Sequence, residues 1–292
     1  MLMDPHLLRT FTTVVRLASF SAAARELGYT QSAVSQHIAA LESDLGVELL
    51  GRRPVAPTEA GTRLLEHAGP LLLRMAAARA EVVRAAHFPA ARLVLGASPL
   101  AFGDRTALAL ARLRAAAPRT DVTVRLLERA GVVAGVACGD IDLGLVDGAA
   151  APSDPLRLPD AGPLHTAGVG EEPLAVLLPD GHPLAARDGL RLTDLIDALW
   201  LDAPDAAIPL GELRAACGNG FRPGPRYNGT DVRAVLALVR AGHGLALLPA
   251  SVAGAGGVPL SAPRLVHRTE SLHRGDPGPA ALHLTELLSA SE

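Results

Sequence analysis

The feature that most constrains this chain is a run of three short helices within its first 46 residues, each with its own start and stop signals. Asp4 is a good helix-capping residue, and Pro5 suits the first helical position. From Leu7 to Ala18 apolar residues recur at helical spacing, which predicts the first helix. A second helix is predicted over residues 19–27.

The second and third helices have equally clear ends. Ser21 is the expected cap of the second helix, and Gly28 is its expected stop. The third helix is predicted over residues 31–45, between Thr30 and Gly46. Three helices in so short a stretch predict a small all-α domain.

The third helix has the pattern of a recognition helix. The small residues 22–24 allow two helices to cross closely, and Val34, Ile38 and Leu41 face the predicted core. Four polar residues near the start of the helix fall on one exposed edge: Gln31, Ser32, Ser35 and Gln36. Glutamine amides pair with the edge of adenine and serine hydroxyls with bases or phosphates, so this edge is suited to the major groove of DNA.

Charge does not argue for DNA binding by itself. The net charge is -3, and the charges of residues 1–57 cancel, so the prediction depends on the geometry of the helices. After the third helix, the Pro-rich segment GRRPVAPT suits the wing of a winged helix better than a helix or a central strand.

A long helix follows from Thr58 and Glu59. Its seam residues alternate at spacings of three and four: Gly61, Leu65, Ala68, Leu72, Met75, Arg79, Val82 and Ala86. Leu64, Leu71 and Val83 widen this stripe. Such a helix either packs on its own domain or pairs with a second copy, and the width of the stripe favours pairing. The segment HFPAA, residues 87–91, interrupts the pattern and is the predicted hinge.

Beyond the hinge, short aliphatic strands alternate with helices, which predicts a parallel sheet with right-handed crossovers. The first set runs from RLVLGAS to IDLGLVDG, and a second set runs from HTAGV to LALLP. Two α/β lobes follow from this repetition. The last strand and helix, RLVHR and PAALHLTELLSA, are expected to return to the first lobe.

The stretch SFSAAARELGYTQSAVSQHIAALESDLGVELLGRRPVAPTEAG resembles the DNA-binding signature of the LysR family. The resemblance implies a winged helix-turn-helix over residues 1–58 and a linker helix with hinge over 59–90. It also implies that Gln31, Ser32 and Ser35 contact bases and phosphates. The wing would contact the DNA backbone through Arg52 and Arg53. Gln36 departs from the arginine common at its position, which predicts a shallower salt dependence of binding. A winged domain that binds protein remains the alternative.

The resemblance continues over residues 91–292 and implies a two-lobed α/β fold like that of periplasmic solute-binding proteins of type 2. Lobe I would comprise about 91–161 and 266–292, and lobe II about 162–265. Family members place effector contacts around the cleft between the lobes. The matching positions here are Ser98, Leu100, Ala101, Asp147, Leu201, Asp202 and Thr230.

The effector class stays open between a small carboxylate and an amino acid. If Pro99 opens a helix, the backbone N–H groups beside Ser98 form an anion site, although Ser98 could serve only as a helix cap. Leu100 and Ala101 stand where relatives often have a second hydroxyl, which argues against a densely hydroxylated anion pocket. Asp147 or Asp202 could bind an ammonium group, or each could cap a neighbouring helix.

Other chemistry has little support in the sequence. No nucleotide-binding loop is present, the histidine spacing fits no metal signature, and we expect no cofactor and no metal. Most of the ten histidines are expected at the surface. Cys138 and Cys217 fall in different predicted lobes, which argues against a thiol switch. The chain has neither a secretory signal at its start nor a run of apolar residues long enough to span a membrane, so we expect a cytoplasmic location.

These features predict a transcription regulator that binds a palindromic site on double-stranded DNA and responds to a small molecule. The linker helix would pair two copies into a homodimer, or a homotetramer built of dimers. RNA polymerase is a further partner that the resemblance allows. Two alternatives remain: a ligand-independent architectural DNA-binding protein, whose cleft would be filled by its own side chains, and an enzyme built on the two lobes. The enzyme is disfavoured because no nucleophile and base occur at a recognisable spacing.

Overall fold

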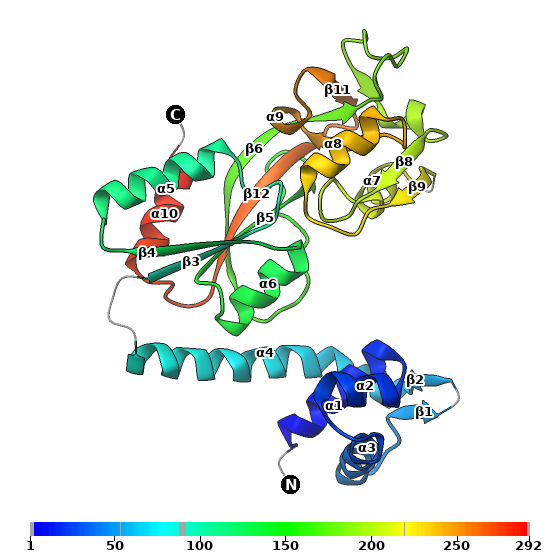
Figure 1. Cartoon of the computed structure of the whole chain (residues 1–292), viewed down its shortest axis with the longest axis vertical. Coiled ribbons are helices and arrows are strands. Elements are labelled where there is room, and N and C mark those ends of the chain that lie inside the picture. The colour runs from blue at the N-terminus through cyan, green and yellow to red at the C-terminus, as the bar shows by residue number, and fades with distance from the viewer. Residues whose placement is uncertain (1–2, 53, 88–91, 219, 291–292) are drawn as a thin grey trace. The chain divides into compact units, whose positions relative to one another are not determined.

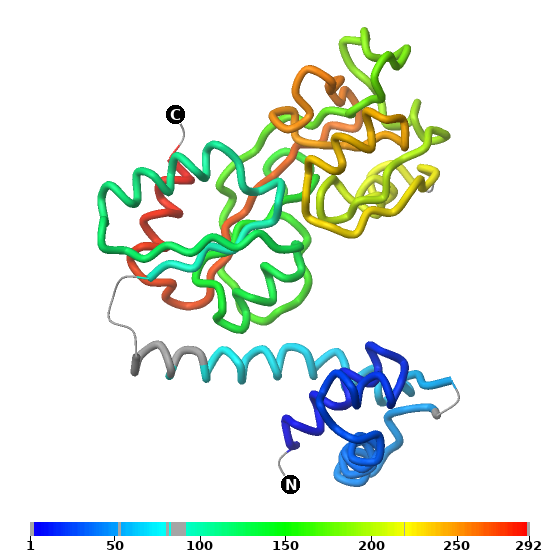
Figure 2. Tube along the Cα trace, in the orientation of Figure 1, coloured from blue at the N-terminus to red at the C-terminus, as the bar shows by residue number. Residues whose placement is uncertain are grey.

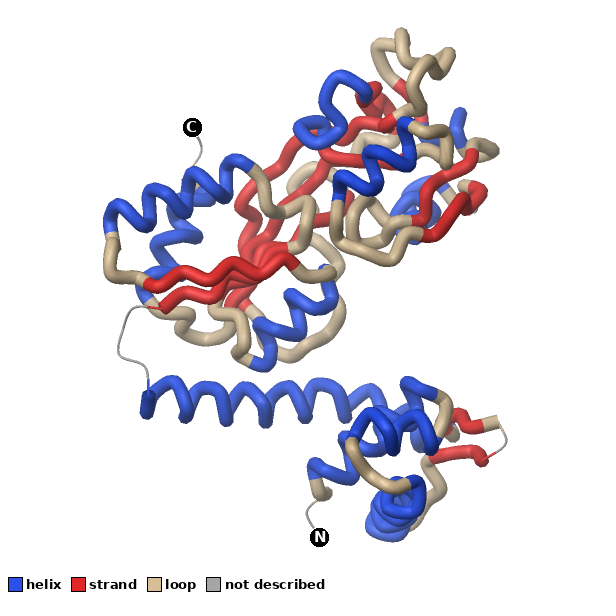
Figure 3. Tube along the Cα trace, viewed as in Figure 1, coloured by secondary structure: helices blue, strands red, loops and turns tan. Residues whose placement is uncertain are grey.

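A computed structural model describes residues 3–52, 54–87, 92–218 and 220–290. The chain forms two compact units, one up to Val82 and the other comprising nearly all residues from Val83 onward (Figures 1 and 2). Helices dominate the first unit, whereas a curled sheet flanked by helices dominates the second (Figure 3).

The first unit contains the three predicted helices and a short hairpin. Its elements are α1 (Pro5–Leu17), α2 (Phe20–Leu27), α3 (Gln31–Leu45), β1 (Leu50–Arg52), β2 (Val55–Pro57) and α4 (Glu59–His87). Asp4 and Thr30 cap α1 and α3, and Gly28 and Gly46 end α2 and α3 in the left-handed conformation, as predicted. The predicted cap of α2 is wrong, because α2 begins earlier and Ser19 accepts its capping hydrogen bond.

The core of this unit is formed by the predicted inner faces of the helices. Phe11, Val34, Ile38 and Leu41 are buried. The wing is a two-stranded antiparallel ladder of β1 and β2. Glu42 on α3 fixes its start, because the Oε1 atom accepts hydrogen bonds from the backbone N–H groups that lead into β1.

The apolar stripe of the long helix α4 is partly buried in its own unit and partly exposed. Near its start Leu64 and Ala68 are buried in the core of the first unit. Further along, Leu71, Met75 and Val82 are exposed by 44%, 52% and 70%. An apolar surface therefore remains on the second half of the helix. Of the predicted hinge, residues 88–91 lie outside the described residues.

The second unit alternates strands and helices as predicted. Its first elements are β3 (Arg92–Ala97), α5 (Asp104–Ala116), β4 (Asp121–Leu126), α6 (Arg129–Cys138), β5 (Leu143–Ala150) and β6 (His165–Leu177). Then follow β7 (Leu190–Arg191), β8 (Leu199–Asp202), α7 (Leu210–Cys217), β9 (Arg222–Arg226) and α8 (Val232–Arg240). The last are β10 (Ala246–Pro249), α9 (Ala250–Ala253), β11 (Gly257–Ala262), β12 (Val266–His273) and α10 (Pro279–Ser289).

The main sheet has the strand order β4-β3-β5-β12-β6-β11-β7, with β10 also paired to β6. Strands β3, β4 and β5 are parallel, as predicted, and β12 is antiparallel to β5 and β6. HTAGV and LAVLLP form one strand, β6, because the intervening Glu171, Glu172 and Pro173 stay in the ladder with β12. The sequence does not predict β7, β9 or β11, which are very short or contain Gly and Pro.

Strand β6 connects two hydrophobic cores (Figure 1). Its first half pairs with β12 and contributes Val169 to a core between the sheet and helices α5 and α10. Its second half pairs with β10 and β11 and belongs to clusters around Trp200 and Val235. We call these parts the first and second lobe.

Candidate functional site

The exposed edge of α3 lies largely where the sequence places it. Gln31, Ser32 and Gln36 are exposed, whereas Ser35 is half-buried. Ser21 Oγ donates to Gln31 Oε1 at 3.1 Å, which ties the start of α3 to α2. Thr30 Oγ1 and Ser32 Oγ lie 2.9 Å apart. The first turn of α3 thus presents amide and hydroxyl groups to solvent.

A contact that the sequence did not indicate holds α3 against α1. His37 Nδ1 lies 3.1 Å from Thr10 Oγ1, which itself donates to the backbone oxygen of His6. The hydroxyl proton of Thr10 is therefore in use, so His37 Nδ1–H is the donor. On the wing, Arg52 belongs to β1 but its side chain is not described, and Arg53 lies outside the described residues.

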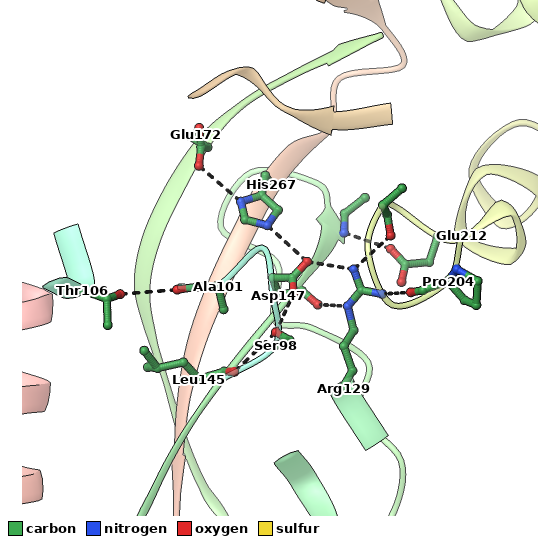
Figure 4. Close-up of polar contacts among 12 residues, drawn as sticks. Ser98, Ala101, Thr106, Arg129, Leu145, Asp147, Glu172, Pro204, Glu212 and His267 are labelled. Atoms are coloured by element: carbon green, nitrogen blue, oxygen red, sulfur yellow. Dashed lines mark hydrogen bonds and ion pairs between the residues drawn. The ribbon is translucent and has the colours of Figure 1, made fainter. Parts of the chain in front are cut away.

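In the second unit the structure brings Ser98 and Asp147 together (Figure 4). Both are buried, Ser98 directly after β3 and Asp147 within β5, and Ser98 Oγ donates to Asp147 Oδ1 at 2.5 Å. Helix α5 begins only at Asp104, with Gly103 as its N-cap. The predicted helix start at Pro99 is therefore wrong, and so are the anion site at that start and the capping role of Ser98.

Asp147 is the centre of a buried charge network. Arg129 Nη2 donates to Asp147 Oδ2 at 2.8 Å, and His267 Nε2 lies 3.2 Å from the same oxygen. Burial alone would raise the pKa of Asp147, but the charge of Arg129 and the hydrogen bonds from His267 and Arg129 hold it well below its usual range. The cation that Asp147 binds here is a guanidinium of the same chain, so its contact with an effector stays a prediction.

His267 lies between two carboxylates. Its Nδ1 is 3.5 Å from Glu172 Oε1, on the side away from Asp147, and Glu172 Oε2 accepts from the backbone of Ser251. Burial alone would lower the pKa of His267, but the hydrogen bonds to Asp147 and Glu172 outweigh it and raise the pKa. The favoured state is an imidazolium with both N–H groups bonded. His267 is thus an exception to the expectation that most histidines lie at the surface.

Two further contacts join the two lobes along their boundary, which we call the seam. Glu212 on α7 accepts a hydrogen bond at Oε2 from the backbone N–H of Ala149, 2.9 Å away at the end of β5. Leu100, just after β3, is buried in the second lobe's cluster with Leu201 and Val235. The predicted cleft residues Leu100, Ala101 and Leu201 are thus core residues.

The remaining predicted contacts lie in different surroundings. Asp202 is half-buried and pairs with Arg226 across 3.4 Å, between Oδ2 and Nη1. Thr230 is exposed immediately before α8, whose cap is Asp231. Of the predicted polar set, only Ser98 and Asp147 are joined by a hydrogen bond that the structure describes.

The sequence did not single out Arg129, Glu172, His267 or Glu212 as site residues. Each is polar within or beside an apolar strand or helix, and their partners lie between 18 and 120 positions away. A charged residue beside an apolar segment, such as Arg129 before AGVVAGVAC, was the available signal. The identity of its partner was not available from spacing.

The described residues hold no cluster of three or more His, Cys, Asp or Glu side chains suited to a metal ion. Cys138 and Cys217 are both free, and burial raises the pKa of each thiol. Raised pKa values make thiols less reactive. None of the helices in the described part of the chain combines the length and apolar character that a bilayer span requires.

Comparison with known proteins agrees with this organisation. Residues 5–62 match the family described as "Bacterial regulatory helix-turn-helix protein, lysR family", and residues 86–287 match the "LysR substrate binding domain". The chain is 28% identical over 249 residues to the HTH-type transcriptional regulator AlsR of Bacillus subtilis (strain 168), covering 84% of this chain and 80% of AlsR. It is 33% identical over 204 residues to the small neutral protease regulatory protein of Streptomyces coelicolor, covering 68% and 62%.

Solved structures share the fold over nearly the whole length. Full-length BenM is 25% identical, with coverage of 98% of this chain and 95% of BenM and a TM-score of 0.53. CbnR, a LysR family transcriptional regulator, is 21% identical, with coverage of 99% and 100% and a TM-score of 0.55. Because the two family matches span both units, the chain belongs to the LysR family of DNA-binding transcriptional regulators and has an effector-binding domain.

Proposed function

We propose that this regulator reads a palindromic operator through the exposed edge of α3. The observation that supports this best is the exposure of Gln31, Ser32 and Gln36 on a helix whose other face is buried. The amide of Gln31 can pair with a base edge, and the hydroxyls can bind bases or phosphates. The wing residues Arg52 and Arg53 would contact the backbone of the DNA.

The test is a gel shift with the intergenic DNA upstream of the gene. The double variant Gln31→Ala, Ser35→Ala should bind at least tenfold more weakly, because each good base contact contributes about 1–3 kcal/mol. Ser43→Ala is the matched control, since Ser43 is exposed near the far end of the same helix. A double variant that binds like the parent would remove α3 as the reading element.

The exposed apolar residues of α4 support a dimer through this helix, and a tetramer if dimers associate further. Met75→Glu is the sharpest test because Met75 is half exposed, whereas Leu72 also packs on the core of the first unit. A charge on this apolar face of α4 should weaken the dimer and lower the mass measured by light scattering. A variant of unchanged mass would place the dimer interface elsewhere.

The second unit would sense a small molecule at the seam between its lobes and thereby shift the DNA-binding heads. The residues proposed for effector contact remain Ser98, Leu100, Ala101, Asp147, Leu201, Asp202 and Thr230. The relatives described above are regulators, so we propose a regulator without enzymatic activity, acting in the cytoplasm. RNA polymerase is a further proposed partner, and co-purification with this protein would test the interaction.

A further inference from the structure

Arg129 connects the two lobes through one guanidinium group. It is the first residue of α6 in the first lobe, where Nε donates to the backbone oxygen of Asp147 at 2.9 Å and Nη2 to Asp147 Oδ2 at 2.8 Å. In the second lobe, Nη1 donates to the backbone oxygen of Pro204 and Nη2 to that of Ala207 at 3.3 Å. Both carbonyls belong to the segment between β8 and α7 (Figure 4).

The surroundings of this guanidinium are those of a cation site. All four hydrogen bonds described for it end on oxygen acceptors, three of them backbone carbonyls and one a carboxylate. The negative charges of Glu212 and Asp205 act on it as well. A fork of N–H donors fits such a set of acceptors, whereas a carboxylate placed here would meet only acceptors and like charges.

The space between the lobes is filled by the chain itself at this point. Ser98 Oγ, which is predicted to contact a ligand, is committed to Asp147, and so is His267 Nε2. Leu100 occupies the adjoining apolar part of the seam and packs in the second lobe's cluster with Ala203 and Ala207. The two lobes are therefore joined by polar and apolar contacts without an external molecule.

We propose that Arg129 is a built-in ligand, whose guanidinium fills a cation site between the lobes and holds them together without an effector. The proposal rests on the proposed sensing function of the second unit and narrows its chemistry. A compound that enters this site must replace Arg129 and offer several N–H donors with positive charge, as an alkylguanidine or an amine does. A small carboxylate is the wrong class for it.

Chemical rescue of Arg129→Ala tests the site directly. Thermal unfolding of the full chain is followed by the fluorescence of Trp200, the single tryptophan, which is buried in the second lobe. We expect Arg129→Ala to lower the Tm, and about 10 mM methylguanidinium to raise it again by a few degrees, as a ligand of millimolar affinity would. The parent should not respond, because its site is filled.

Controls separate a specific site from a general salt effect. Sodium acetate at the same concentration should not stabilise Arg129→Ala. Arg226→Ala removes an exposed guanidinium that also pairs with an aspartate, and it should not respond to methylguanidinium. Failure of methylguanidinium to stabilise Arg129→Ala, an equal response of the parent, or rescue by acetate would each overturn the proposal.

Arg129→Lys covers the case in which Arg129→Ala does not fold. The lysine keeps the charge, but its three N–H donors lie on one nitrogen and cannot replace the four hydrogen bonds of the guanidinium, so we expect a lower Tm than that of the parent. An unchanged Tm would contradict a site built for a guanidinium. Gel shifts on the same preparations keep the two proposals apart: if the parent binds no DNA, operator reading by α3 fails, while the rescue result still decides the cation site.

Discussion

The polar side chains of α3 and those at the seam between the lobes differ in burial and in hydrogen bonding. On α3, Gln31 and Gln36 are exposed to solvent, and Gln31 Oε1 accepts a hydrogen bond from Ser21. At the seam, Ser98 and Asp147 are buried and fully engaged with partners from the same chain. The surface proposed to read DNA is exposed to solvent, whereas the site proposed to bind an effector must break internal bonds before it can bind through these groups.

The difference follows from the cost of burial. An exposed amide exchanges water for a base edge at little cost, whereas a buried carboxylate must keep hydrogen-bonded and charged partners. The sensing proposed at the seam would therefore be linked to the stability of the second unit, whereas the DNA reading proposed for α3 would not. Substitutions that separate stability from binding test this comparison.

The largest effect is expected for Asp147→Ala. It leaves Arg129 and His267 buried without their shared carboxylate, and breaking such a buried pair costs about 3–5 kcal/mol. Urea unfolding followed by Trp200 fluorescence measures the loss. Asp202→Ala is the matched control, since its partner Arg226 is 65% exposed and the pair should contribute less than about 1 kcal/mol. Equal effects of the two variants would show that the network does not set the stability of this unit.

In the first unit, Glu42 also fixes a strand through its carboxylate. Replacing it should lower the free energy of unfolding by less than Asp147→Ala does. Its carboxylate accepts from the N–H groups of Leu49 and Leu50 at 2.8 and 3.2 Å. Glu42→Ala should cost roughly 2 kcal/mol, as for hydrogen bonds to a charged group, and should speed hydrogen exchange of those two amides. The exposed Glu48 provides the control, Glu48→Ala. Unchanged exchange in Glu42→Ala would mean that the wing is fixed by other contacts.

The pH dependence of stability should sharpen the comparison further. Because folding raises the pKa of His267 above its ordinary value of 6.5, its contribution is complete below pH 6.5 and is lost as the pH rises through the folded pKa. We expect the free energy of unfolding of the parent, measured by Trp200 fluorescence, to fall over this pH range, and we expect a flatter profile in His267→Gln.

His273 gives a control of opposite sign. Burial and the charge of His165 lower its pKa, so its protonation opposes folding below pH 6.5. His273→Gln should therefore change the acidic side of the profile and leave the alkaline side as in the parent. A parent profile that is flat above pH 6.5 would show that His267 is not held protonated.

The smallest effects are expected for the two hydroxyls predicted to contact an effector. Ser98→Ala removes one donor to Asp147, which keeps Arg129 and His267, and should cost about 1.5 kcal/mol of unfolding free energy, the low end for a hydrogen bond to a charged group. Thr230→Val, at an exposed position, should leave the thermal unfolding of the second unit unchanged. If Thr230→Val is the more destabilising of the two, the contrast between buried and exposed site residues does not hold.

The sequence by itself determined the elements whose signals are local. Caps, glycine stops and helical spacing gave α1, α3 and the buried face of α3, because a helix is fixed by residues three or four positions apart. Alternating strands and helices gave the parallel strands β3, β4 and β5 in the same way. The LysR signature lies within such a segment, which is why the family was evident before the structure.

Only the tertiary structure decided what the seam between the lobes contains. Asp147 meets Arg129, 18 positions away, and His267, 120 positions away, and Arg129 meets Pro204, 75 positions away. No periodicity links residues at such separations. Spacing alone therefore left Asp147 open between binding an ammonium group and capping a helix, whereas folding gave it a guanidinium and an imidazole from the same chain, because a buried carboxylate is stable only with such partners.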